Sequence, residues 1–80
     1  MMEDRQRLLS LLQDVRDDVD FAGETALIQD GLIDSLDITV IIAAIDEAFG
    51  VHIRAADIEP ENFDSVDAML RLIGRCEAAR

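Results

Sequence analysis

The spacing of apolar residues predicts a helix at each end of the chain. The first runs from Met2 to Val15, because apolar side chains recur at intervals of three and four residues with no glycine or proline between them. Its apolar positions are Leu8, Leu11, Leu12 and Val15. The last helix runs from Ser65 to about Cys76, where apolar residues share one broad face.

The most apolar segment of the chain lies between these two helices, from Ser35 to Phe49. Its early part, ITVII, taken alone is typical of a buried strand, because β-branched residues favour strands. However, the segment is too long for an ordinary strand, continues into good helix formers and stops at Gly50, a residue type that commonly ends helices. We therefore expect a third helix here.

The segment from Asp17 to Asp30 has a different character. It is acidic, contains Gly23 and has only scattered apolar residues. We expect a long ordered loop that is anchored in the core by Phe21, Leu27 and Ile28. A loop of this length in a compact domain usually has a functional or packing reason.

The second connection, Val51 to Asn62, contains Pro60, which excludes a continuous helix through it. A short helical turn is expected around Ala55–Ile58. The sequence thus predicts an all-α fold, a small four-helix bundle of three main helices and one short helix, with the long loop between the first two main helices. Residues 1–80 are expected to form one domain, since the chain is too short for two.

The chain is strongly acidic, and this limits its partners. It has 18 acidic residues against seven arginines and no lysine, which gives a net charge of −11. The negative electrostatic field of this charge repels phosphate backbones and anionic lipids, so we expect neither nucleic acid nor a membrane as a partner. It favours encounter with proteins that display Arg or Lys, although solubility alone is an equal explanation of the acidity.

The chain has one cysteine and one histidine, His52, and neither predicts a catalytic or metal site. The single cysteine, Cys76, cannot form an internal disulfide, and the N-terminal stretch has no long apolar segment, so a cytoplasmic location is expected. The acidic stretch Asp18–Gln29 lacks carboxylates at two positions that a calcium loop needs. No metal site is predicted.

One short pattern occurs twice, as DSLD at Asp34–Asp37 and as DSVD at Asp64–Asp67. In both copies an Asp precedes a predicted helix, and a second Asp follows three residues later. The first Asp can accept a bond from a backbone N–H of the first turn, and the second can reach back to the first. We therefore expect both copies to be helix caps, and at Asp64–Asp67 capping explains the whole pattern.

Capping does not explain the surroundings of Ser35. Its hydroxyl would lie beside unpaired N–H groups of a helix N-terminus, which stabilise a phosphate ester. Gly31 upstream allows a close approach of the backbone or of another protein, and Leu32 and Ile33 supply apolar contacts. The residue types around Ser35 therefore indicate a modification site.

The segment GLIDSLDI resembles the attachment motif of acyl carrier proteins, in which a glycine and variable residues precede Asp-Ser-Leu. In that family the serine is esterified by 4′-phosphopantetheine, whose terminal thiol carries an acyl group as a thioester. The resemblance covers the whole chain, including the EAFG close of the central helix and the final helix after FDSV. It implies that Ser35 is the attachment residue, that Asp34 is the motif acid, and that the protein itself catalyses nothing.

The resemblance also implies that the central helix contacts partner enzymes. The contact residues that it implies are Leu36, Asp37, Asp46 and Glu47, and the position of Val40 on the helical wheel adds this residue to them. Fatty-acid members of the family commonly have glutamate where this chain has Val40. On a helical wheel, Leu36, Val40, Ala43 and Glu47 lie opposite the predicted core face, so an apolar stripe with an acidic border would face solvent, as at a docking site. The alternative is that the Asp17–Asp30 loop partly covers Val40.

The resemblance implies a monomeric carrier for fatty acid, polyketide or related biosynthesis within lipid metabolism. Its partners would be a phosphopantetheinyl transferase, an acyl- or aminoacyl-loading ligase and downstream acyl-processing enzymes. Two alternatives stay open: an aminoacyl carrier loaded by an adenylating ligase, and an unmodified acidic helical interaction module.

Overall fold

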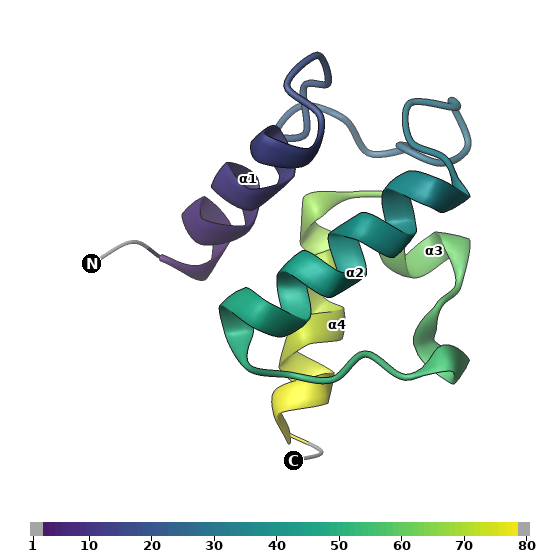
Figure 1. Cartoon of the computed structure of the whole chain (residues 1–80). Helices are drawn as coiled ribbons and strands as arrows, with labels where there is room; N and C mark the ends of the chain where they lie inside the picture. Colours follow the sequence, from purple (N-terminus) through teal and green to yellow (C-terminus); the bar gives the residue numbers. More distant parts are fainter. Residues whose placement is uncertain (1–2, 79–80) are drawn as a thin grey trace.

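The computed structural model describes residues 3–78, and its regular secondary structure there is all helical, with no strand among these residues (Figure 1). Its elements in chain order are α1 (Asp4–Val15), α2 (Ser35–Phe49), the 3-10 turn η1 (Ala55–Asp57), α3 (Pro60–Phe63) and α4 (Val66–Ala78). The all-α bundle of three main helices and one short helix is thereby confirmed. The predicted start of the first helix at Met2 lies outside the described residues.

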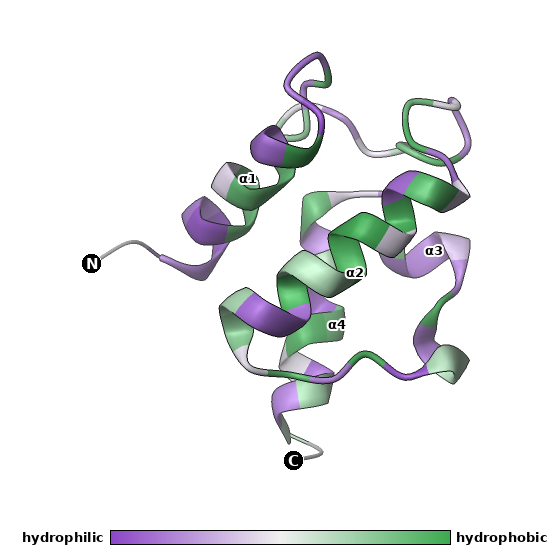
Figure 2. Cartoon of the chain, in the orientation of Figure 1, coloured by the Kyte–Doolittle hydropathy of each residue, from purple (hydrophilic) through white to green (hydrophobic). Residues whose placement is uncertain are grey.

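The helices enclose one core, which is mainly aliphatic and also includes the three phenylalanines, Phe21, Phe49 and Phe63. Most apolar residues of α1 and α4 face this core, whereas α2 also carries apolar residues on its outer side (Figure 2). Residues with no exposed surface come from α1, α2 and α4 alike: Leu8, Leu12, Ile41, Ile45, Met69 and Leu72. No polar or charged residue is buried within residues 3–78, so the core is held together by apolar burial and close packing.

Helices α1 and α2 run antiparallel side by side (Figure 1). At one end the Arg7 guanidinium donates to the Ala48 carbonyl and lies over the Phe49 ring, 4.4 Å from its centroid. This supplies positive charge at the carboxyl end of α2, whose own last turn has no basic residue. At the other end Arg16 contacts Asp37. Arg7 and Arg16 thus fix the two helices at both ends.

The loop between α1 and α2 is anchored in the core as the sequence predicts, and more of its residues are buried than the three predicted anchors. Phe21 and Leu27 are fully buried, and Ile28 is half-buried. Val19 and Ile33, which were not predicted as anchors, are buried as well. The loop therefore contributes to the core along its length.

The connection from 51 to 62 contains the one clear departure from the predicted elements. The expected helical turn exists as η1, but the short α-helix follows it, with Pro60 at its first position. Proline suits that position, because its fixed φ matches the helix and its missing N–H would have no partner there. Pro60 therefore starts a helix in a segment that we had predicted to be a connection.

Two helix ends also differ slightly from the predictions. Helix α4 begins at Val66, one residue later than predicted, and extends to Ala78. Helix α2 has the predicted bounds, and Gly50 follows it in the left-handed region at φ +65°. None of the helices in residues 3–78 combines the length and the apolar character that a membrane crossing requires.

Candidate functional site

Ser35 is exposed at the first position of α2, directly after the N-cap residue Asp34. The Asp34 carboxylate accepts the Asp37 N–H at 2.9 Å, and the Asp37 carboxylate accepts the Asp34 N–H at 3.2 Å. This reciprocal capping box confirms the role predicted for the first copy of the repeated pattern. It leaves the Ser35 hydroxyl without a hydrogen-bond partner among the described residues.

The backbone around Ser35 offers unpaired donors. The N–H groups of Ser35 and Leu36 lie in the first helical turn, so they have no partner within the helix. Upstream, Gly31 has φ +73°, which a residue with a side chain rarely adopts, and no atom lies within 4 Å of where its Cβ would be. The glycine is thus explained by the backbone conformation, and no close approach of another part of the chain accounts for it.

Arg16 links this N-terminus to the end of α1, and sequence reasoning missed it. Its guanidinium donates to the Asp37 carboxylate at 2.8 Å and to the Asp18 carboxylate at 3.0 Å. These contacts raise the pKa of Arg16, Asp18 contributing most, and the hydrogen bond from Arg16 lowers the pKa of Asp18. The sequence did hold a sign of this contact. Arg16 is the only arginine or lysine between Leu8 and Ile53, and acidic residues flank it.

A groove opens beside Ser35, between α2 and the segment that carries η1 and α3. It has a volume of about 290 Å³. It is lined by Ser35, Ile38, Thr39, Ile42, Ile58, Glu59, Pro60 and Phe63. Hydrogen bonding to Glu61 and the charges of Glu61 and Asp57 raise the pKa of Glu59 at its edge. An apolar trough therefore begins at the exposed hydroxyl.

The second copy of the pattern is built differently, and the prediction that Asp64 caps a helix is wrong. Asp64 ends α3 with helical dihedrals (φ −74°, ψ −19°). The cap of α4 is Ser65, whose Oγ accepts the Ala68 N–H at 3.0 Å. The Asp64 carboxylate instead accepts the N–H groups of Ile28 and Gln29 at 2.9 and 3.3 Å. Ser65 therefore has a structural role, as expected, but it acts as the helix cap itself, where the sequence predicts Asp64 to be the cap.

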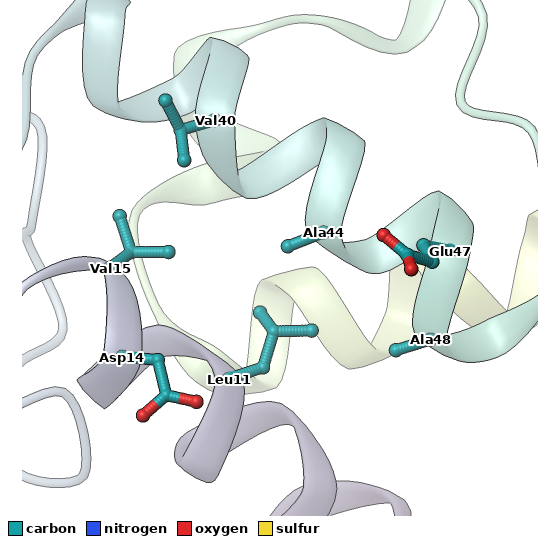
Figure 3. Close-up of a pocket in the computed structure, with 7 residues that line it drawn as sticks. All are labelled: Leu11, Asp14, Val15, Val40, Ala44, Glu47 and Ala48. Atoms are coloured by element: carbon teal, nitrogen blue, oxygen red, sulfur yellow. The ribbon is translucent and has the colours of Figure 1, made fainter.

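The five residues predicted as partner contacts divide into two groups. Leu36 is 73% exposed and Val40 is 47% exposed, and together with exposed Ala43 and Glu47 they form a solvent-facing stripe on α2. Figure 3 places Val40 next to Val15 of α1.

The carboxylates of Asp37 and Asp46 have partners within the chain. Asp37 belongs to the capping box and pairs with Arg16, and Asp46 accepts the Ile53 N–H at 3.2 Å. Asp37 and Asp46 therefore stabilise the fold through these contacts.

The remaining reactive side chains lie away from Ser35. Cys76 is buried, and this burial raises the pKa of its thiol, which keeps it protonated and inert. His52 is exposed, with its Nδ1 3.9 Å from an Asp46 carboxylate oxygen. Within residues 3–78 no three His, Cys, Asp or Glu side chains are grouped as a metal site would need.

The site therefore consists of an exposed hydroxyl at a helix N-terminus, two unpaired N–H donors, a neutralising arginine and an adjoining apolar groove. This arrangement can hold an ester-linked anionic group and an apolar chain attached to it. Comparisons with protein-family models, curated proteins and solved structures return no match for this chain.

Proposed function

We propose that this chain is an acyl carrier protein, with 4′-phosphopantetheine esterified to the Oγ of Ser35. The observation that carries the proposal is the exposed, unbonded hydroxyl of Ser35 at the capped N-terminus of α2, within GLIDSLDI. The capping box fixes the turn and leaves that hydroxyl accessible to a modifying enzyme. The proposed partners are a phosphopantetheinyl transferase, a loading ligase and acyl-processing enzymes.

The residues around Ser35 fit a phosphodiester, which bears a single negative charge. The N–H groups of Ser35 and Leu36 are unpaired within the helix and can donate to its oxygens. Asp34 and Asp37 would repel it, but Arg16 pairs with Asp37 and offsets one of these charges. When attached, the group supplies a thiol that carries the acyl cargo as a thioester.

The groove beside Ser35 supports an apolar cargo. Ile38, Ile42, Ile58 and Phe63 line it, so an alkyl chain tethered at Ser35 could leave water without crossing the surface of the domain. Partner enzymes would meet the exposed stripe of Leu36, Val40 and Glu47, which begins one residue after the attachment point.

Intact mass spectrometry tests the proposal directly. The chain is co-expressed with a broad-specificity phosphopantetheinyl transferase, and we expect a gain of one phosphopantetheine group. Ser35→Ala should abolish the gain, while Ser65→Ala, the matched serine of the second copy, should retain it. Absence of any gain in the native sequence would leave an unmodified acidic interaction module as the function. Loss of the gain in Ser65→Ala but not in Ser35→Ala would overturn the proposal as well, because the group would then be attached at Ser65.

A further inference from the structure

A second groove lies between α1 and α2, apart from the one that begins at Ser35. It has a volume of about 660 Å³. Figure 3 shows the side chains of Leu11 and Val15 on α1 facing those of Val40 and Ala44 on α2. Ala48 extends the same apolar floor. The two helices are thus separated by an open apolar trough at this point, although they are fixed together at both ends by Arg7 and Arg16.

The rim of this groove carries one carboxylate on each wall. Asp14 stands on α1 and Glu47 on α2 (Figure 3). Within residues 3–78 neither carboxylate forms an ion pair or a side-chain hydrogen bond, whereas Asp4, Asp18, Asp37, Asp57 and Asp67 each pair with an arginine. Other exposed acids, such as Asp17 and Glu77, are also unpaired in this part of the chain. Asp14 and Glu47, however, are the ones that stand beside the apolar floor, where their charge is available to an occupant of the groove.

We propose that the α1–α2 groove binds a basic amphipathic helix of a partner protein. Apolar side chains one helical turn apart would occupy the floor made by Leu11, Val15, Val40, Ala44 and Ala48. Arg or Lys residues on the two flanks of that helix would pair with Asp14 and Glu47. The floor follows α2 from Val40 to Ala48, about 12 Å or roughly two turns, which matches a helix laid in a groove.

Charge complementarity selects this occupant over others. A second copy of the chain would bring another net charge of −11 and no lysine to an acidic rim. A nucleic acid or an anionic lipid surface would be repelled by the same rim. The inference extends the proposed function, because Val40 and Glu47 also belong to the stripe that partner enzymes would meet, but it requires no group on Ser35 and can be tested on a chain that cannot be modified.

The test uses the full chain with Ser35→Ala and a labelled helical peptide of about 20 residues. The peptide is made of Leu, Ala and Arg, with Leu at positions i and i+4 and Arg on both flanks. Fluorescence anisotropy measures its affinity, and a scrambled peptide of the same composition is the control. We expect the ordered peptide to bind at least about tenfold more tightly, since only it presents an apolar face.

Variants locate the binding. Asp14→Asn with Glu47→Gln should weaken it about tenfold, because each rim pair contributes up to about fivefold. Asp30→Asn with Glu77→Gln removes the same charge at exposed sites outside the groove and should weaken it less than about twofold. Ala44→Leu fills the floor and should weaken binding at least about tenfold, whereas Ala43→Leu, exposed on the same helix but outside the groove, should not.

Equal weakening by the two charge-removing double variants would overturn the proposal, because the general field of the protein would then explain the binding. Equal affinity for the ordered and scrambled peptides would overturn it too, as would a fully retained affinity in Ala44→Leu. Circular dichroism of each variant shows whether it is folded. Should Ala44→Leu fail to fold, Leu11→Ala replaces it, with the expectation that loss of floor area weakens binding of the ordered peptide by at least about threefold.

Discussion

The segments Asp34–Asp37 and Asp64–Asp67 differ in a single residue, yet their side chains have exchanged roles. In the first, the acid caps the helix and the serine is left exposed. In the second, the serine caps the helix and the acid holds the α1–α2 loop through the N–H groups of Ile28 and Gln29. Nearly the same tetrapeptide thus leaves a serine hydroxyl exposed in one place and ties distant segments together in the other.

The difference originates in the residues that precede each pattern. Asp34 follows a loop and has extended dihedrals (φ −119°, ψ −174°), as an N-cap requires. Asp64 follows α3 and still has helical dihedrals, so its side chain cannot reach back over the first turn of α4. The helix start therefore moves one residue later, and Ser65 takes the cap. The tetrapeptide alone does not determine which residue caps.

The largest difference between the copies is expected at their first aspartate. Asp64→Ala removes the acceptor of two loop N–H groups, one of them on half-buried Ile28, and should lower the free energy of unfolding by about 2–3 kcal/mol. Asp34→Ala removes one helix cap and should cost about 1 kcal/mol. Urea denaturation of both variants measures the difference.

Asp64→Asn is the matched control, since its amide retains an oxygen that can accept these bonds, and it should recover more than half of the loss. Equal destabilisation by Asp64→Ala and Asp34→Ala would mean that Asp64 acts only as a cap after all.

The sequence predicted most accurately those elements whose ends are determined locally. The bounds of α2 are correct because a capping box and Gly50 define them within a few residues. Helix α3 was missed because it has four residues and too little length for a periodic pattern, and that omission produced the wrong role for Asp64. At the candidate site, Ser35 and Asp34 follow from local motif chemistry, whereas Arg16 and both grooves depend on how distant helices pack.

The serines of the two copies should also differ in what their loss costs: Ser65 supports the fold, and Ser35 does not. Ser65→Ala removes the bond to the Ala68 N–H and should lower the free energy of unfolding by about 1 kcal/mol. Ser35→Ala should change it by less than about 0.5 kcal/mol, because the Ser35 hydroxyl bonds to nothing in residues 3–78. Thermal and urea unfolding of the two variants, side by side, give the measurement. A greater loss in Ser35→Ala would mean that its hydroxyl already serves the fold.

The smallest expected effect concerns Arg16, which supports only the first copy. Because the hydrogen bond from Arg16 lowers the pKa of Asp18 in the folded state, this carboxylate stabilises the protein above its ordinary pKa. The contribution is lost as pH falls through the lowered value. Arg16→Gln removes it, so the variant should lose less stability than the native chain between about pH 7 and about pH 3. Both side chains reach solvent, so the effect should be smaller than that of Ser65→Ala or of either aspartate variant. Arg71→Gln, which removes an exposed arginine that pairs with no acid in residues 3–78, should lose as much as the native chain. An equal loss in all three would show that the Arg16–Asp18 pair has no part in acid stability.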